Sequence, residues 1–391
     1  MGAKKSWVTF IAAMSLLLTA CSQESGASAA ESNTGITEEV IETMEAETFR
    51  VSQEISLPGA SGGERTGEPV TVRFAGDFCL AEGFAITEAL DRRGDIRECF
   101  SDDLLKLMSD ADLFMLNNEF TYSDRGTPTE GKDWTFRAGP ERVSVLNTLG
   151  VDIAGLANNH AYDWGEDALL DTVSTLQNAG IVTVGAGKNL EEARKPAYFT
   201  LQGRTISVVA ATAVEKVGDR EYGMTKAATA DSAGVFSTID PADCVDTIRE
   251  AKANSDFVFV YVHWGTEMTT EIDADQKDLA KAYIDAGADA VVGNHPHVLQ
   301  GFEYYNGKPI LYSLGNFWFN SKDRETCVLE FAIDPETMEA QMKFLPCLQS
   351  DCYTKLITEE SEKSRMIREM TEISFGGVSI DENGIVTEGE G

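Results

Sequence analysis

The stretch Ala290-Val291-Val292-Gly293-Asn294-His295-Pro296-His297 is a short apolar run that passes into a loop bounded by glycine and proline and carrying two histidines. A short run of β-branched residues followed by turn residues predicts a buried strand. The His-x-His spacing can direct two imidazoles at one centre. Because ligands gather at the carboxyl ends of strands in open α/β sheets, this stretch predicts both the fold class and the place of a site.

Polar side chains follow four other predicted strands in the same way. All four histidines of the chain lie at the ends of these five strands. Taken singly, Asp77 or Asn159 can cap a turn, and Glu119 can be a solvated loop acid. His263 alone can be a hydrogen-bonded core histidine. Taken together, carboxylate, amide and imidazole groups at successive strand ends predict a metal site. The candidate residues are Asp77, Glu119, Asn159, His160, His263, His295 and His297.

Short apolar runs alternate with helical patterns from Val70 onward, which predicts βα units with mostly parallel pairing. An Asn306-Gly307 turn between two apolar runs predicts a hairpin. The predicted strands are Val70–Ala75, Leu113–Leu116, Asp152–Leu156, Ile181–Val184, Thr205–Ala211, Phe257–Val262 and Ala290–Val292. The predicted helices are Ser101–Asp110, Glu141–Leu149, Glu166–Ala179, Pro241–Asn254 and Ala274–Ala286.

The composition excludes several classes of protein. With 32 Lys and Arg against 65 Asp and Glu, the formal net charge is −33. Nucleic acid and anionic membrane surfaces are therefore unfavourable partners. Hydrophobic residues at 42% and charged residues at 25% are globular values, and they exclude a disordered or collagen-like chain.

The first residues have the pattern of a bacterial lipoprotein signal. Lys4 and Lys5 precede an apolar run that is too short to span a bilayer, and Leu18-Thr19-Ala20-Cys21 has the form of a lipobox. We expect residues 1–20 to be a signal peptide and Cys21 to be lipidated, which would place the protein outside the cytoplasm on the cell membrane. An ordinary secretory peptide with an incidental cysteine is the alternative. Residues 21–68 are acidic and rich in small residues, so we expect a disordered tether before a single domain at 69–391.

Six further cysteines allow fifteen disulfide connectivities, and the sequence does not choose among them. Export permits oxidation, although a domain of this size does not require it. The pair that we favour is Cys347 with Cys352.

The ordered motifs resemble the CapA/PgsA-type capsule and poly-γ-glutamate synthesis proteins, a branch of the calcineurin-like metallophosphoesterase superfamily. The resemblance covers about Val70 to Phe319. It implies an α/β fold, a four-layer αββα sandwich of two mixed β-sheets. The motifs that carry it are Gly76-Asp77, Asn118-Glu119, Phe136-Arg137-Ala138, Leu156–His160 with Asp163 and Gly165, His263-Trp264-Gly265, Gly293–His297 and Tyr312–Phe317.

The resemblance also implies roles for single residues. One metal ion would be held by Asp77, Glu119 and His297. A second would be held by Glu119, Asn159, His263 and His295, and this richer set is the one that we expect to be filled if only one ion binds. His160 matches the histidine that assists the leaving group.

Two departures from the superfamily pattern bear on the number of ions. Cys79 stands where the first motif usually has histidine, and Glu119 stands where a shorter aspartate usually bridges the metals. Cys79 can supply a thiolate ligand or can simply be a small buried residue. One or two divalent ions are therefore expected, and the ligand types do not distinguish Mn, Zn and Fe.

These observations predict a metal-dependent hydrolase in which an activated water attacks a phosphoester or an amide and His160 acts as general acid. Asp163 can orient His160 or can cap the following helix. Arg137 is a candidate anion-binding side chain, with a surface salt bridge as the alternative. Asn316 is a candidate polar group lining the site, with a turn residue as the alternative. The expected partner is a capsule or poly-γ-glutamate polymer or a phosphoester, within a possible membrane complex for capsule synthesis. The alternative function is a non-catalytic lipoprotein that assists assembly and export of the polymer.

Overall fold

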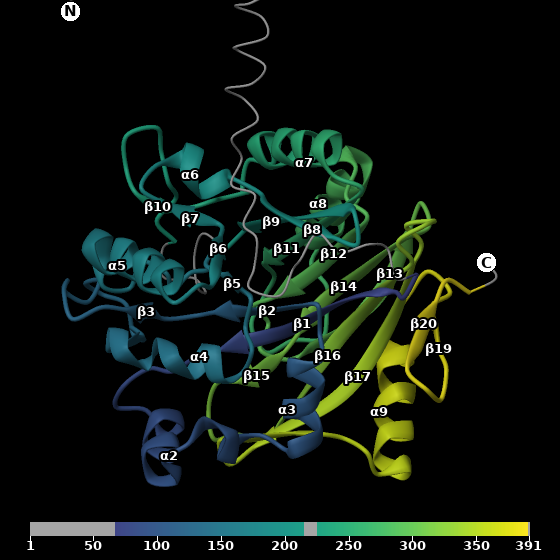
Figure 1. Cartoon of the computed structure of the whole chain (residues 1–391), viewed down its shortest axis with the longest axis horizontal. Helices are drawn as coiled ribbons and strands as arrows, with labels where there is room; N and C mark the ends of the chain where they lie inside the picture. Colours follow the sequence, from purple (N-terminus) through teal and green to yellow (C-terminus); the bar gives the residue numbers. More distant parts are fainter. Residues whose placement is uncertain (1–66, 215–224, 390–391) are drawn as a thin grey trace, which may run out of the picture. The chain divides into compact units, whose positions relative to one another are not determined.

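The computed structural model describes residues 67–214 and 225–389, and within them the strands form two large mixed sheets (Figure 1). The first sheet has the order β19-β20-β17-β16-β1-β2-β5-β6, with β15 beside β1 and β18 beside β17. Its strands are β1 (Val70–Phe78), β2 (Leu113–Asn118), β5 (Ile153–Gly155), β6 (Val182–Val184), β15 (Asn316–Trp318), β16 (Arg324–Ile333), β17 (Ala340–Ser350), β18 (Tyr353–Leu356), β19 (Ser379–Ile380) and β20 (Ile385–Thr387).

The second sheet has the order β13-β14-β12-β11-β9-β8. Its central strands pair in parallel, whereas β8 and β13 are antiparallel to their neighbours. The strands are β8 (Ala197–Leu201), β9 (Arg204–Thr212), β11 (Phe257–His263), β12 (Ala290–Asn294), β13 (Leu299–Tyr305) and β14 (Lys308–Leu314). Two small ribbons pair β3 (Thr121–Tyr122) with β4 (Arg137–Ala138) and β7 (Ala186–Gly187) with β10 (Gly234–Val235).

Helices cover the outer faces of both sheets (Figure 1). Those packed on the first sheet are α2 (Ala85–Arg93), α3 (Asp102–Ser109), α4 (Ser144–Thr148) and α5 (Gly165–Asn178), with the 3₁₀ turns η1 (Ile96–Cys99) and η2 (Pro140–Val143). Those on the second sheet are α6 (Leu190–Arg194), α7 (Ala242–Asn254) and α8 (Ala274–Ala286). A last helix, α9 (Glu360–Ile373), packs against β13 and β17 at the edge of the sandwich.

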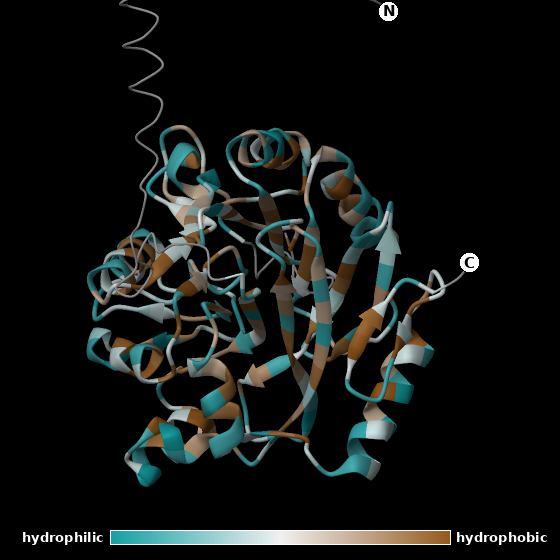
Figure 2. Cartoon of the chain, turned by 45° about the vertical axis from the view of Figure 1, so that its right-hand side comes forward, coloured by the Kyte–Doolittle hydropathy of each residue, from teal (hydrophilic) through white to brown (hydrophobic). Residues whose placement is uncertain are grey.

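Three separate apolar clusters fill the spaces between these layers. Val72, Phe74 and Phe259 belong to the cluster between the two sheets. Phe114 and Leu169 belong to the cluster between the first sheet and its helices, and a third cluster lies under α7 and α8. Burying each large apolar side chain contributes about 1.5–3 kcal/mol, so these layers hold the sheets face to face. Figure 2 shows the hydrophobic residues concentrated on the central strands. The predicted four-layer αββα sandwich is confirmed.

Aspartates placed just before four strands fix the parallel register. The carboxylate of Asp152 accepts the Phe114 N–H at 2.8 Å, and the Asp152 N–H donates to the Phe114 carbonyl at 3.0 Å. The same two-way bridge recurs at the start of three other parallel pairs. It joins Asp112 to Thr71, Asp256 to Thr205, and Asp289 to Val258. These bridges lie at the amino ends of the strands, opposite the loops that carry the polar residues.

All seven predicted strands and the predicted hairpin are present, with ends shifted by a few residues. The predicted helix at 141–149 is divided into the 3₁₀ turn η2 and α4. The long antiparallel strands β16 and β17 were not predicted. The predicted signal peptide, Cys21 and nearly all of the predicted tether lie outside the described residues. Of the helices in the described residues, none has the length and apolar character needed to cross a membrane.

The favoured disulfide between Cys347 and Cys352 is wrong. Both residues are free thiols, as are the four other cysteines that the structure describes. Cys347 lies inside β17, and Cys352 lies in the turn beyond the end of that strand at Ser350. Three extended residues span about 10 Å, and a disulfide needs Cα atoms within about 7 Å.

Candidate metal centre

The carboxyl ends of strands from both sheets meet at one place and bring the predicted residues together. Asp77, the second-last residue of β1, lies next to Asn117 of the parallel neighbour β2. His263 ends β11 beside Asn294 at the end of β12. The six candidate ligands and His160 are buried, except that His297 is partly exposed, and burying polar groups in this way is costly unless they find partners.

Glu119 occupies the middle of this cluster. Its carboxylate is fully buried, and Oε2 accepts a hydrogen bond from Asn117 Nδ2 at 3.0 Å. Oε1 has no hydrogen-bond partner among the described residues. Three imidazole nitrogens surround that oxygen at distances too long for hydrogen bonds: His160 Nε2 at 3.8 Å, His263 Nε2 at 4.0 Å and His297 Nε2 at 4.0 Å.

Two sets of donor atoms are close enough to surround an ion. Glu119 with His295 and His297 forms one set, and Asp77 with Glu119 and His263 forms the other; the donor atoms within each set lie within 4.8 Å of one another. Glu119 belongs to both sets. That shared position agrees with the bridging role implied by the family resemblance, although the grouping of the histidines differs from the one expected.

Direct contacts between candidate ligands connect His263 to two others. His263 Nε2 lies 2.8 Å from Asn159 Oδ1 and 3.0 Å from His295 Nδ1. The Asn159 amide nitrogen is buried and has no hydrogen-bond partner in the described part of the chain. Ligands bound to one ion at about 2.1 Å lie about 3 Å apart, so these spacings suit a common ion.

His297 contacts the other side of the cluster. Its Nδ1 lies 3.0 Å from Asp77 Oδ2 and 2.7 Å from Asn316 Oδ1. Asn316, which was predicted to line the site, therefore holds a histidine in place. Asp77 also accepts a hydrogen bond from Asn117 at 2.8 Å.

The loop after β12 holds both of its histidines in an uncommon conformation. His295 has φ 98° and His297 has φ 58°, in the left-handed region that non-glycine residues rarely adopt. Each such residue costs on the order of 1–3 kcal/mol, and strain of this kind concentrates at functional sites. The conformation turns the two imidazoles inward from either side of Pro296.

A second network positions His160. Its Nδ1 lies 2.7 Å from Asp163 Oδ2, and its Nε2 faces Glu119. Asp163 orients the histidine and does not cap α5, whose N-cap residue is Trp164. Phe136 covers the imidazole with its ring, at 4.3 Å between centroids, and donates its backbone N–H to Asp163 at 2.7 Å.

The electrostatics of the cluster favour a cation. Burial, followed by the charge of Asp77, raises the pKa of Glu119 well above its ordinary value. Burial and the neighbouring imidazoles lower the pKa of His263 and of His295 well below the usual range. Burial also lowers the pKa of His160, although Asp163 opposes that effect. Neutral imidazoles with free lone pairs are the form that binds metal ions.

His297 differs from the other histidines. Burial lowers its pKa, but the hydrogen bond and charge of Asp77 outweigh burial and raise the pKa above its ordinary value. Glu267, in the loop after β11, adds to this increase and to that of Glu119. A carboxylate that the sequence did not single out therefore contributes to the negative field of the site.

Two other residues were missed from the candidate set. Asn117 donates to both Asp77 and Glu119, and the Lys132 ammonium pairs with Asp163 and bonds to the Asn159 carbonyl. Asn117 follows a predicted strand directly, which is a usable signal. Lys132 lies in an irregular loop with no pattern around it, so its sequence gives no indication of burial.

Two of the predicted residues do not join the cluster as ligands. The Arg137 guanidinium lies over the Trp164 ring at 3.6 Å, and no contact described by the structure links it to the candidate ligands. Cys79 is buried, and its thiol is absent from both candidate donor sets. Burial raises the pKa of the Cys79 thiol well above its ordinary value, which favours the neutral, small buried residue over a thiolate ligand.

The donor set fits a divalent ion. A buried carboxylate oxygen without a hydrogen bond is costly, and three imidazole nitrogens at about 4 Å leave room for an ion between them. Mixed nitrogen and oxygen ligands suit Zn, Mn or Fe. The residues that would hold such ions are Asp77, Glu119, Asn159, His263, His295 and His297.

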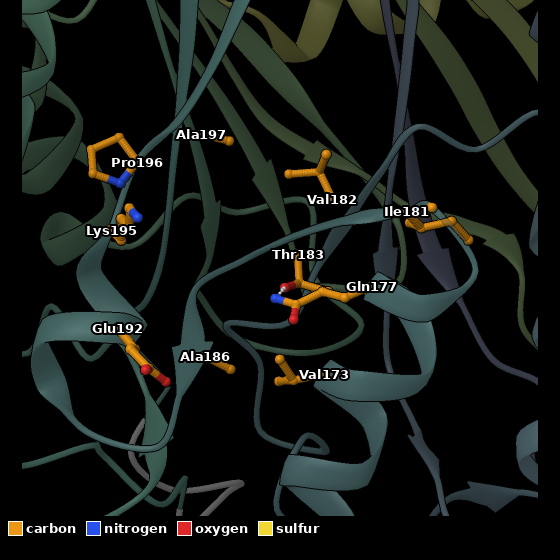
Figure 3. Close-up of a pocket in the computed structure, with 11 residues that line it drawn as sticks. Val173, Gln177, Ile181, Val182, Thr183, Ala186, Glu192, Lys195, Pro196 and Ala197 are labelled. Atoms are coloured by element: carbon orange, nitrogen blue, oxygen red, sulfur yellow. Dashed lines mark hydrogen bonds between the residues drawn. The ribbon is translucent and has the colours of Figure 1, made fainter. Parts of the chain in front are cut away.

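A separate cavity of about 610 Å³ lies where α5, β6 and β8 approach one another (Figure 3). Gln177 donates to Thr183 on its wall, and Glu192 and Lys195 face it from the opposite side. None of the candidate site residues lines this cavity. It carries no cluster of donor groups comparable with the one around Glu119.

The chain therefore has a metallophosphoesterase-like α/β sandwich fold, with carboxylate, amide and imidazole groups gathered at the strand ends. The chain belongs to the family of the bacterial capsule synthesis protein PGA_cap, whose model matches residues 71–321.

Comparison with known proteins gives relatives in this family. The chain is 36% identical over 204 residues to the PGA biosynthesis protein CapA of Bacillus subtilis, covering 51% of this chain and 52% of that protein. It is 31% identical over 247 residues to the capsule biosynthesis protein CapA of Bacillus anthracis, covering 61% and 58%. A probable polyglutamine synthesis accessory protein of Mycobacterium tuberculosis is 35% identical over 211 residues, covering 52% and 55%. The chain thus spans little more than half the length of the relatives it matches.

Proposed function

We propose that the protein is a metal-dependent hydrolase that acts in capsule or poly-γ-glutamate synthesis, with a phosphoester or an amide as the bond cleaved. The observation that carries this proposal is the buried Glu119 Oε1, which has no hydrogen-bond partner among the described residues and faces three imidazole nitrogens. Membership of the capsule synthesis family supports the biological setting.

The residues have distinct tasks in the proposed reaction. Bound divalent ions would lower the pKa of water and neutralise charge on the substrate oxygens. His160 is the proton donor to the leaving group, because Asp163 holds Nδ1 and leaves Nε2 directed at Glu119 in the candidate metal centre. Asp163 also stabilises the protonated imidazole that donation requires.

We also propose that the protein works outside the cytoplasm on a lipid anchor at Cys21. The lipobox sequence before that residue supports this location. The polymer or a precursor bearing phosphate is the proposed partner, and a capsule synthesis complex at the membrane is the proposed setting.

The test is turnover by the purified full-length protein with Mn²⁺. The substrates are a generic phosphodiester, a phosphomonoester and poly-γ-glutamate. His160→Ala should abolish measurable turnover while metal content, determined by elemental analysis, stays at the wild-type value. If His160→Ala is as active as the wild type, His160 is not the proton donor.

A non-catalytic role in assembly or export of the polymer is the second candidate. The description of the Mycobacterium tuberculosis relative as a probable accessory protein favours it. A wild-type protein that binds metal and hydrolyses none of the three substrates, but binds poly-γ-glutamate, would support this role over the hydrolase.

A further inference from the structure

Lys132 is a buried cation beside the candidate metal centre. It lies in the loop between β3 and β4, and its side chain is only 6% exposed. Its ammonium forms an ion pair with Asp163 Oδ1 and donates to the main-chain carbonyl of Asn159. A buried ammonium costs several kcal/mol unless it is paired, so both contacts bear on the geometry around it.

These two contacts reach both functional parts of the site. Asp163 uses its other oxygen to hold His160 Nδ1 at 2.7 Å. Asn159 presents its side-chain oxygen to His263 at 2.8 Å. A single side chain therefore connects the proposed proton donor to a proposed metal ligand one residue away.

The two carboxylate oxygens of Asp163 have different partners, and Oδ1 depends on a cation. Oδ2 accepts from His160 and from the backbone N–H of Phe136, and Oδ1 has Lys132 as its partner. Without Lys132, Oδ1 would be buried without a partner, and Asp163 would be free to rotate. That rotation would alter the hydrogen bond that fixes His160.

We infer that Lys132 is a positioning residue that holds Asp163 and the Asn159 backbone in place. As a result, His160 carries its proton on Nδ1 and directs Nε2 at Glu119 in the candidate metal centre. This inference deepens the proposed hydrolase function and rests on it. Lys132 acts through Asp163 and touches neither substrate nor metal.

The test compares Lys132→Met with Arg73→Met. Arg73 is a matched control because it forms a largely but not fully buried ion pair with Glu330 at 2.6 Å, with side chains 11% and 16% exposed, and neither residue belongs to the candidate donor sets. The first measurement is the tautomer of His160, read from ¹⁵N-labelled imidazole spectra of protein treated with a chelator. The chain has only four histidines, so the four signals can be assigned by substitution.

The wild type and Arg73→Met should show the His160 proton on Nδ1, whereas Lys132→Met should show a shifted signal or a mixture of tautomers. In the metal-loaded protein, Lys132→Met should lower kcat by about 10- to 100-fold with little change in KM, the range seen when residues behind a site's ligands are changed. Both variants should lose thermal stability, because each breaks a buried ion pair.

An unchanged His160 signal in Lys132→Met would overturn the inference and leave Lys132 as a structural ion-pair partner only. If Lys132→Met does not fold, Lys132→Gln, which keeps one donor without the charge, is measured in the same way and judged by the same signal. If the wild type turns over no substrate, the proposed function fails, but the tautomer comparison still decides the role of Lys132.

Discussion

Glu119 is the residue on which the candidate metal centre depends. It is fully buried, it belongs to both candidate donor sets, and one of its oxygens has no hydrogen-bond partner in the part of the chain that the structure describes. Glu119→Gln keeps the size of the side chain but removes its charge. Affinity for Mn²⁺ or Zn²⁺ should fall at least about tenfold, and the rise in Tm that metal produces should shrink accordingly.

Titration calorimetry and thermal unfolding with added metal measure this effect. Glu303→Gln is the matched control, because Glu303 is also buried, at 9% exposure, but accepts a hydrogen bond from Tyr312 and belongs to neither candidate donor set. Wild-type affinity in Glu119→Gln would show that the ions are held elsewhere. In the metal-free state the variant should be no less stable than the wild type, since a buried charge has been removed.

Cys79 stands where the superfamily's first motif usually has histidine, and replacing it tests whether its thiol is a metal ligand. Its thiol is buried, has a raised pKa and lies in an apolar cluster with Phe78 and Leu80. Cys79→Ala should therefore keep the wild-type metal content and lose only on the order of 1 kcal/mol of stability from the small cavity left behind. Loss of an ion from Cys79→Ala, measured by elemental analysis, would instead identify the thiolate as a ligand.

At the scale of elements, the aspartate bridges explain how neighbouring βα units keep one register. Each bridge ties the residue before a strand to the strand alongside, so the carboxyl ends of β1, β2 and β5 arrive level with one another. A slip by one residue would turn every side chain of a strand to the other face. The positions of Asp77 and Glu119 thus depend on contacts at the far end of the sheet.

The bridge between Asp152 and Phe114 makes the stability of the folded state depend on pH. Burial raises its pKa to about 6, against the opposing hydrogen bond from Phe114. The folded state therefore binds a proton more tightly than the unfolded state between about pH 4 and pH 6, and stability falls as the pH rises through that range. Asp152→Asn keeps an acceptor for Phe114 and cannot ionise. Relative to the wild type, it should gain about 1 kcal/mol between pH 5 and pH 7.5.

Chemical denaturation at the two pH values measures this difference. An Asp152→Asn variant whose stability relative to the wild type is the same at both pH values would contradict the assignment.

At the scale of the whole molecule, the sequence was sufficient to predict strands and site residues where a local pattern repeats. Strand ends followed by Asp, Asn or His are visible in the chain, and two sheets bring those ends together. Lys132 and Glu267 were not predictable, because their place beside the site depends on how long loops fold back and on no local pattern. The strand β16 was missed for a related reason, since its pairing with β1 joins segments more than 200 residues apart, and β17 pairs in turn with β16.

The attachment of the molecule to a membrane should depend on Cys21 alone. The formal charge of −33 opposes adsorption to an anionic bilayer, so no other part of the surface is expected to compensate for a lost lipid. The full-length wild type, expressed in a bacterium, should fractionate with membranes and carry an acyl chain on its N-terminal peptide. Cys21→Ala should lose the acyl chain and leave the membrane fraction, whereas Cys244→Ala, which changes a thiol on the buried face of α7, should not. Mass spectrometry of the N-terminal peptide and immunoblots of the two fractions measure this, and a Cys21→Ala protein that stays with the membranes would refute the lipid anchor.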